Sequence, residues 1–174
     1  ELTYDTYHEN YDRLGQIMLH QSFNGEKKAS VSVPIPLGPL LKENFSEDFD
    51  HISFASRNWP HQLSYGDKHL NEAGMHVEPI FPEMLSLELI HGSMEDALSD
   101  PSSIMMSEPV AIALFGDEDP YGKIIKYDNQ SDLKVTAVYK GLPDNSSFKN
   151  VDILVPWDFY VKENQWVDQA GDQW

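Results

Sequence analysis

The sequence predicts an α+β (mixed α/β) fold, and three observations carry this prediction. Segments with helical spacing and segments with strand-like alternation follow one another along the chain. A strand, a helix and a second strand are expected within the first sixty residues. Further along, two alternating stretches, Lys123–Tyr127 and Leu133–Tyr139, flank a short polar turn and predict a β-hairpin. Together these patterns indicate a sheet with helices packed on it.

The first fourteen residues carry apolar or aromatic side chains at a spacing nearer to 3.6 than to 2 (Leu2, Tyr4, Tyr7, Tyr11 and Leu14). This spacing predicts an amphipathic helix that ends at Gly15. Residues 16–20 are then expected to form a short strand. The turn signal Asn24-Gly25 follows, and a second extended stretch is expected at 29–33.

A short helix is predicted over residues 36–45, because four apolar side chains recur there at helical spacing (Leu37, Leu40, Leu41 and Phe45). Pro36 is acceptable in the first turn of such a helix. Residues 52–57 return to a strand pattern. Strand, helix and strand in this order describe a βαβ unit that packs its helix on one face of the sheet.

The middle of the chain predicts a hairpin and a second short helix. Residues 63–77 have the pattern of a hairpin with its turn at 65–68. A helix is expected to open at Glu78-Pro79, to run through Leu85 and to close at His91-Gly92, where glycine can adopt the left-handed cap conformation.

A third block of the sequence predicts a strand that leads directly into a helix. The apolar triplet 104–106 is typical of a buried strand. Ser107 is placed to cap the following helix, whose first turn holds Glu108 and Pro109. Gly116 is expected to end this helix.

Composition limits the kinds of partner that the protein can have. The 174 residues include 12 lysines and arginines against 29 aspartates and glutamates, which gives a net charge of −17 that repels nucleic acid and anionic lipid. A hydrophobic content of 40% predicts a folded domain, and no cysteine is present. The longest apolar run, Val110 to Phe115, is far shorter than the ~20 residues of a membrane span. The chain opens at Glu1 without a signal-like segment and is expected to be a piece of a longer protein.

Four segments carry a resemblance to a known family. The longest runs from Leu98 to Tyr127, with LFGDEDPYGK at its centre, and the segment from Leu133 to Trp157 follows it. Together with 4–14 and 36–42, they resemble in the same order the MacB-like periplasmic core domain of FtsX-type ABC transporter permeases. The resemblance covers nearly the whole chain.

This resemblance implies a porter-like βαβ layer that is interrupted by an inserted β-rich lobe. The first half of the porter-like α/β subdomain is expected at 1–60, the lobe with its short helices at 61–156, and an aromatic-rich return segment at 157–174. The second βαβ half is expected to be missing from this chain, which stops at Trp174 where that half would begin.

The resemblance further implies a non-catalytic extracytoplasmic, periplasmic domain of an inner-membrane permease. Such a domain couples cytoplasmic ATP hydrolysis to export, extraction or signalling on the periplasmic side. The implied partners are its own transmembrane helices, a second permease copy, a cytoplasmic ABC ATPase subunit and a periplasmic or outer-membrane protein. Neither a cofactor nor nucleic acid is expected.

The residues themselves nominate no catalytic, cofactor or metal site. The acidic stretch 117–128 imitates a calcium-binding loop, but Tyr121 and Asp128 stand where a carboxylate or amide and a glutamate are required, so a turn is favoured. The seven histidines form no H-x-x-x-H pair, and packing or surface roles are expected for them.

One candidate interaction surface remains, made of Trp157, Tyr160 and Trp166. Large aromatic faces with polar edges suit a sugar or a partner protein. This surface carries the alternative hypothesis of a secreted carbohydrate- or peptide-binding module. Packing within the domain is the competing explanation for the same rings.

Overall fold

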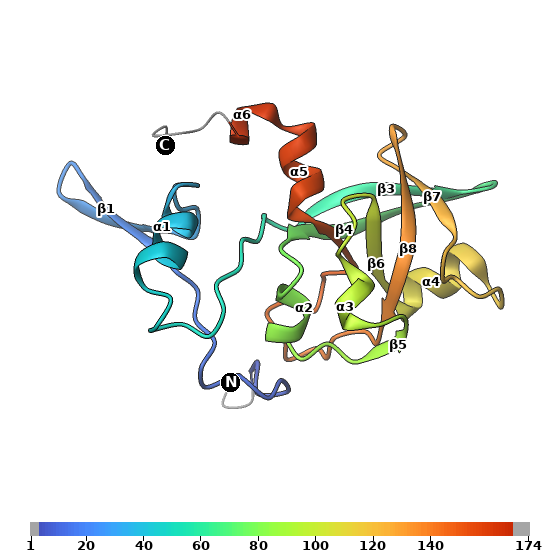
Figure 1. Cartoon of the computed structure of the whole chain (residues 1–174), viewed down its shortest axis with the longest axis horizontal. Helices are drawn as coiled ribbons and strands as arrows, with labels where there is room; N and C mark the ends of the chain where they lie inside the picture. Colours follow the sequence, from blue (N-terminus) through green and yellow to red (C-terminus); the bar gives the residue numbers. More distant parts are fainter. Residues whose placement is uncertain (1–3, 169–174) are drawn as a thin grey trace.

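The computed structural model describes residues 4–168, which form two regions (Figure 1). A sheet and its helices occupy residues 59–168, and we call them the sheet region. Residues 15–58 project from it as a hairpin and a helix, and we call them the arm. Residues 4–14 form turns that lie against the sheet region, where the Asp5 carboxylate accepts a hydrogen bond of 2.7 Å from the Ser147 N–H. The predicted α+β class is confirmed.

Within the described residues, seven strands form one sheet in the order β5-β8-β6-β9-β4-β3-β7. Their bounds are β3 Trp59–Tyr65, β4 Lys68–Val77, β5 Leu89–His91, β6 Ser103–Ser107, β7 Ile124–Tyr127, β8 Ser131–Tyr139 and β9 Ile153–Pro156. Because β8 also pairs with β7, six of these strands close into a ring and β5 is attached to β8 outside it. A closed ring leaves few strand edges unpaired.

The ring mixes parallel and antiparallel pairs. Strands β4 and β9 run parallel, as do β6 and β8, while the other neighbours are antiparallel. A parallel pair requires a crossover, and helix α4 (Glu108–Phe115) supplies part of the crossover between β6 and β8. Thr136 lies at a shift of register between these two strands. Its hydroxyl donates to the carbonyl of Ala97 and so ties helix α3 (Met94–Ala97) to the sheet.

Alternate residues of the strands fill two apolar clusters on opposite faces of the sheet. On β6, Ile104 and Met106 join the inner cluster, whereas Met105 between them joins the outer one. Helix α4 contacts β3, β4, β6 and β8 and covers the inner cluster with the side chains of Val110, Leu114 and Phe115. The outer cluster includes residues of helix α2 (Phe81–Met84) and of α3.

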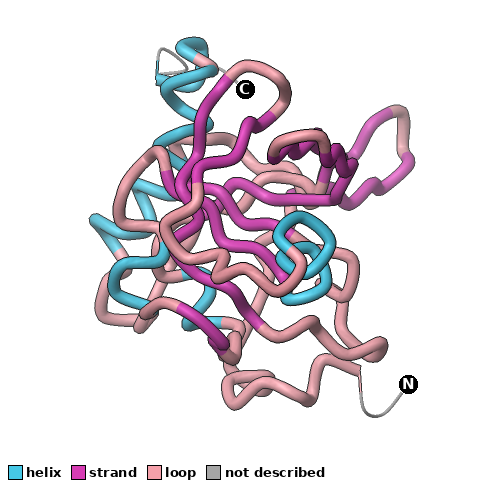
Figure 2. The backbone as a smooth tube through the Cα atoms, turned by 90° about the vertical axis from the view of Figure 1, so that its right-hand side faces the viewer, coloured by secondary structure: helices cyan, strands magenta, loops and turns pink. Residues whose placement is uncertain are grey.

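The remaining helices of the sheet region are α5 (Trp157–Glu163) and α6 (Gln165–Asp168). Helix α5 begins directly after β9 and packs on β4 and β9. In the turned view, most of the strands lie together in the middle of the molecule, and one hairpin projects to the side (Figure 2). No helix within residues 4–168 has the length and apolar character that a membrane span requires.

The arm has little buried surface of its own. Strands β1 (Leu19–Phe23) and β2 (Glu26–Ser30) pair only with each other among the described residues, and positive φ angles of 51° at Asn24 and 83° at Gly25 form their tight turn. Helix α1 (Leu37–Asn44) follows. Large apolar side chains of the arm are exposed (Ile17, Met18, Val31, Leu40, Phe45 and Phe49). A two-stranded hairpin of this kind gains little stability by itself.

Several predicted elements are confirmed. The hairpin at 123–139 is β7–β8, the hairpin at 63–77 is β3–β4, and the helix at 36–45 is α1. Helix α4 ends at Gly116, which has a φ of 64°. Ser107 occupies the predicted N-cap position, but its side chain forms no cap hydrogen bond, and the hydroxyl donates instead to the Asp152 carboxylate at 3.2 Å.

Other predicted elements are wrong, and each was overridden by contacts with distant residues. The helix expected at 2–14 is a series of turns over 4–13, since Asp5 adopts a φ of 56° and bonds to Asn145 and Ser147. Leu2 lies outside the described residues. The strand expected at 52–57 forms a single bridge between Ala55 and Val77.

The helix expected to run from Glu78 towards His91 is also wrong in its length. Only Phe81–Met84 is helical, and Ser86, with a φ of 52°, turns the chain so that Leu89–His91 can pair with β8. Pairing with β8 satisfies backbone groups that a longer helix would have satisfied internally. The helical spacing of residues 78–91 is a local pattern and carries no information about pairing with β8, which replaced the longer helix.

Candidate functional site

The first turns of α5 fold over the end of β4. Parallel pairing places His76 beside Val155, and α5 begins only two residues after Val155. The imidazole of His76 therefore lies parallel to the ring of Phe159, with centroids 6.1 Å apart and planes 4° apart. The centroid of the Tyr160 ring lies 5.1 Å from that of His76. His76 is buried, with 7% of its surface exposed.

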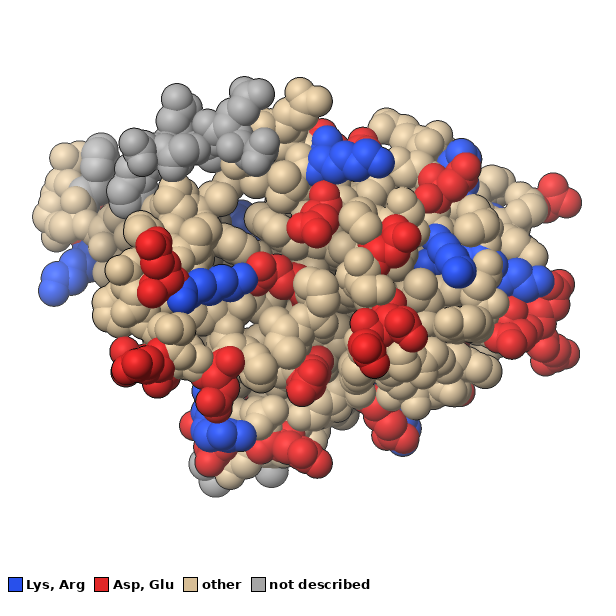
Figure 3. Space-filling view, in the orientation of Figure 1, with Lys and Arg blue, Asp and Glu red and all other residues tan. Residues whose placement is uncertain are grey.

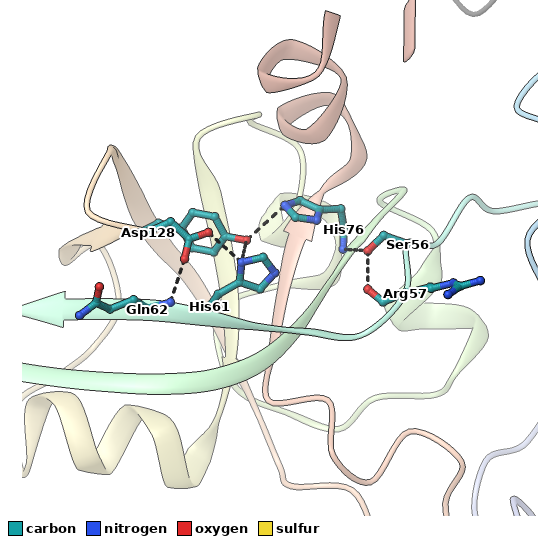
Figure 4. Close-up of polar contacts among 7 residues, drawn as sticks. Ser56, Arg57, His61, Gln62, His76 and Asp128 are labelled. Atoms are coloured by element: carbon teal, nitrogen blue, oxygen red, sulfur yellow. Dashed lines mark hydrogen bonds and ion pairs between the residues drawn. The ribbon is translucent and has the colours of Figure 1, made fainter. Parts of the chain in front are cut away.

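A chain of hydrogen bonds connects His76 to two other strands (Figure 4). The Tyr127 hydroxyl, at the end of β7, lies 3.2 Å from Nε2 of His76 and 2.8 Å from Nδ1 of His61 on β3. The same Nδ1 lies 2.8 Å from Oδ2 of Asp128. We call these four residues the imidazole cluster. It joins strands β3, β4 and β7 at one end of the ring.

Asp128 is held in place by the turn that follows β7. It adopts a φ of 49°, and its Oδ1 accepts a hydrogen bond of 2.8 Å from the backbone N–H of Gln62. The carboxylate can only accept, so Nδ1 of His61 carries a proton and donates it to Asp128. The Tyr127 hydroxyl then donates to Nε2 of His76, which acts as an acceptor on a neutral ring.

Burial sets the protonation states of this cluster. Burial, and to a smaller degree the neighbouring His61, lowers the pKa of His76 from 6.5 to about 4, against the smaller opposing effect of Asp128. Burial, with a smaller contribution from Asp128, raises the pKa of the Tyr127 hydroxyl well above its usual range. Near neutral pH, Tyr127 therefore keeps the proton that it donates and His76 stays uncharged.

One buried side-chain atom of the cluster has no hydrogen-bond partner within the described part of the chain. Nε2 of His61 is buried and unpaired. The hydrogen bonds of the cluster connect β3, β4, β7 and the turn that follows β7. Such an arrangement links three strands to α5 and fixes their relative positions.

A stack of aromatic rings extends from the imidazole cluster toward the arm. The rings of Tyr160 and Trp157 have centroids 5.1 Å apart, and Trp157 stacks on Phe54 with centroids 5.0 Å apart and planes 11° apart. Phe54 lies in the last part of the arm, the segment that connects α1 to β3. Rings from the arm, α5 and β4 are thus in continuous contact.

Phe54 is also the point where α1 meets the sheet region. A Cβ atom added to Gly38 of α1 would collide with the Phe54 ring, so only glycine permits this approach. Lys42 of the same helix lies over that ring at 5.7 Å and pairs with Glu78 at 2.6 Å. The other oxygen of Glu78 accepts a bond of 2.8 Å from the Phe54 N–H. We call Gly38, Lys42, Phe54, Glu78 and Trp157 the joint.

Hydrogen bonds to the end of β4 hold the connecting segment in register. The Ser56 hydroxyl accepts from the His76 N–H at 2.9 Å, and the Ser56 N–H donates to the His76 carbonyl at 2.8 Å. Figure 4 shows Ser56 and Arg57 beside His76. His76 therefore belongs to the cluster through its ring and holds the segment between α1 and β3 through its backbone.

The three residues of the predicted interaction surface are placed differently. Trp157 and Tyr160 lie together on α5 and are only partly buried, whereas Trp166 lies on α6 with 58% of its surface exposed. Residues 169–174 of the aromatic-rich return segment lie outside the described residues. The interaction surface stays a prediction, and its Trp157 also belongs to the joint.

The start of the acidic stretch, residues 117–123, is a turn, as the sequence favoured, and the chain then enters β7. Oδ1 of Asp119 accepts from the Tyr121 N–H at 2.9 Å, and Glu118 pairs with Lys123 at 2.5 Å. Asp128 is turned toward β3. Among residues 4–168, no group of three or more histidine, aspartate or glutamate side chains is arranged to hold a metal ion.

Sequence reasoning missed the imidazole cluster. His61 and Asp128 are 67 residues apart, and His76 and Tyr127 are 51 apart, so no local spacing connects them. The histidines looked scattered because only strand pairing brings them together. One weak signal was available, a polar turn directly after the alternating stretch that ends at Tyr127.

Comparisons with known proteins agree on one family. The family model of the MacB-like periplasmic core domain matches residues 2–173. None of the curated proteins matches the chain. Among solved structures, a domain of a putative permease protein from Porphyromonas gingivalis is similar at a TM-score of 0.64 and 24% identity, over 77% of this chain and 56% of that one.

Two further structures show the same fold. The periplasmic region of MacB from Actinobacillus actinomycetemcomitans aligns with a TM-score of 0.56 and 16% identity, over 77% of this chain and 59% of that one. The extracellular domain of the noncanonic ABC-type transporter YknZ from Gram-positive bacteria aligns at 0.50 and 20% identity, over 65% and 57%. The chain thus spans less than two thirds of the length of each structure. By its sequence match over residues 2–173, the chain belongs to the family of MacB-like periplasmic core domains of ABC transporter permeases.

Proposed function

We propose that this domain is a non-catalytic mechanical element that couples ATP hydrolysis in a cytoplasmic ABC ATPase to export, extraction or signalling on the periplasmic side. The family match over residues 2–173 is the observation that carries the proposal. The similar MacB and YknZ structures are a periplasmic region and an extracellular domain, respectively. The proposal places this domain outside the inner membrane, anchored by transmembrane helices of the same protein and working beside a second permease copy.

The geometry adds a reason for a mechanical role. The arm rests on the sheet region through the joint, where Phe54 lies between Gly38 of α1 and Trp157 of α5. A movement of the arm is transmitted directly to α5 and from there to His76 in the ring. The arm and the sheet region are connected by a small number of contacts. Such a connection suits a hinge between two bodies, because a hinge needs two arrangements that are close in free energy.

The division of the chain belongs to this proposal. The porter-like half at 1–60 contains the arm, the lobe at 61–156 contains most of the ring, and the segment 157–174 begins with α5. The second βαβ half of the porter-like layer is proposed to lie outside this chain. The exposed apolar side chains of the arm, such as Leu40 and Phe45, support this because a second half would bury them.

A cross-link across the joint tests the proposal in the full-length permease assembled with its ATPase. The chain contains no cysteine, so Lys42→Cys with Glu78→Cys can be joined by a short reagent that reducing agents cleave. We expect ATP hydrolysis by the assembled transporter to fall when the link is made and to recover when it is cleaved. The single variant Lys42→Cys, treated in the same way, is the control. An unchanged rate in the linked protein would refute mechanical coupling through this domain.

A further inference from the structure

Helix α4 and strand β5 lie in the part of the sheet region distant from the arm (Figure 1). The residues that line a hollow of about 350 Å³ come mainly from these two elements and from the loop after α4. Its apolar surface comes from three elements. Helix α4 contributes Ala111 and Ile112, β5 contributes Ile90, and β8 contributes Val138. Ile112 is 58% exposed and Ile90 is 42% exposed, although both belong to elements that pack on the core. Apolar side chains exposed in a concave place are typical of an interaction surface.

Carboxylates surround this hollow. Glu108 stands at the start of α4, and Asp117, Glu118 and Asp119 follow its end. Glu118 is paired with Lys123, but neither Glu108 nor Asp117 forms an ion pair with another described residue. No lysine or arginine lines the hollow among the residues described, and His91 lies 4.0 Å from Asp119. In the space-filling view, acidic side chains gather over the end of α4 and the loop that follows (Figure 3).

The carboxylates beyond the end of α4 are in an electrostatically unfavourable position in the isolated domain. The C-terminus of a helix carries the negative end of its dipole, so acidic side chains just beyond Phe115 repel it. A positively charged group bound there would remove this repulsion. The hollow therefore has an aliphatic surface, and the carboxylates at its rim are not neutralised by lysine or arginine side chains among its lining residues.

We propose that this hollow is a docking site for a cationic amphipathic peptide segment of a partner protein. An aliphatic side chain of the segment lies between Ile90 and Ile112, and its lysine or arginine side chains face Glu108 and Asp117. Charge complementarity selects this occupant, because an anionic peptide, a nucleic acid or an anionic lipid surface would be repelled by the same rim. The inference goes beyond the mechanical role and does not depend on it, so either can fail alone.

The probe for this proposal is a fluorescein-labelled peptide of leucine and lysine, roughly twelve residues long, which forms an amphipathic helix of about three turns. We expect its fluorescence anisotropy to rise on titration with the 174-residue protein at low salt. Replacing the exposed Ile112 by asparagine is expected to weaken binding about tenfold, the effect of losing one buried aliphatic contact. The matched control is Ile124→Asn, which changes another exposed isoleucine, 53% exposed, outside the hollow.

A charge series separates docking from general attraction to an acidic protein. Glu108→Gln with Asp117→Asn is expected to weaken binding severalfold at low salt. Glu47→Gln with Asp67→Asn removes the same charge from exposed positions elsewhere and is expected to leave binding nearly unchanged. Equal weakening by both pairs would overturn the proposal, as would equal binding of a probe whose leucines are replaced by serine. Far-UV circular dichroism of each variant shows whether it is folded.

Discussion

The sheet region and the arm are made from the same kinds of residues but are held together in different ways. In the sheet region, strand pairing closes a ring around Ile104, Met106, Leu114 and other side chains that have no exposed surface. In the arm, β1 and β2 pair only with each other among described residues, and Leu40 of α1 is 53% exposed. Stability therefore resides in the ring, and the arm depends on the joint.

This difference suits a domain that must move without unfolding. A ring with two apolar clusters resists deformation, because each strand is fixed by both neighbours and by packing on its two faces. An element with little buried surface can open at a small cost in free energy. Three predictions test this comparison, from the largest expected effect to the smallest.

The largest difference between the regions is expected from equivalent leucine substitutions. Leu114→Ala removes a fully buried side chain from the inner cluster and should lower the free energy of unfolding by about 3 kcal/mol. Leu40→Ala in the arm should change it by less than about 0.5 kcal/mol. Urea unfolding followed by tryptophan fluorescence measures both, since all four tryptophans lie outside the arm. A similar cost for the two variants would mean that the arm is part of the same cooperative unit.

The imidazole cluster should give the sheet region a pH dependence that the arm lacks. The pKa of His76 is lowered to about 4, so below about pH 6.5 the unfolded chain binds a proton that the folded protein does not. Stability from this residue is complete above about pH 6.5 and is lost as the pH falls through 4. The expected loss between about pH 7 and pH 5 is roughly 2 kcal/mol.

Two variants isolate this contribution from that of the carboxylates. His76→Phe keeps an aromatic ring beside Phe159 but cannot titrate, so its stability should fall less steeply between about pH 7 and pH 5 than that of the unaltered protein. His20→Gln removes an exposed histidine of β1 and should leave the pH dependence unchanged. Identical slopes for His76→Phe and the unaltered protein would contradict the assignment of a neutral His76.

The smallest effect is expected at the joint, and it should be confined to the arm. Phe54→Ala removes the ring between Gly38 and Trp157, which should weaken the attachment of the arm by about 1–2 kcal/mol. Hydrogen exchange should become faster for backbone amides of α1 and remain unchanged for β6 and β8. Phe49→Ala, which removes an exposed ring of the arm, is the control. Faster exchange throughout the ring after Phe54→Ala would show that the two regions are not separate.

Prediction from sequence succeeded where local patterns and tertiary contacts agree. The segment 103–116 is an example, because an apolar triplet, a proline in the first helical turn and a terminal glycine all specify β6 and α4. At 4–13 the helical spacing was present, but bonds from Asp5 to Asn145 and Ser147 hold the chain in turns. Secondary-structure patterns carry no information about partners so far away in the chain.

The candidate site illustrates the same limit. Trp157 and Tyr160 were identified from their chemistry, and the structure adds that they stack between Phe54 and His76. His61, His76, Tyr127 and Asp128 could not be grouped, since each lies on a different strand or turn. Their proximity depends on the antiparallel pairing of β3 with β4 and of β3 with β7.

The sequence by itself determined the α+β class, the β7–β8 hairpin, the helices α1 and α4 and, through segments such as 98–127, the family. Each of these depends on side-chain spacing, turn residues or motif order, which are properties of the linear chain. Only the tertiary structure decided that the strands close into a ring, that the arm rests on Phe54 and that two histidines share one tyrosine hydroxyl. These features depend on which distant segments pair, and that choice is made by the burial and hydrogen bonding of the whole chain.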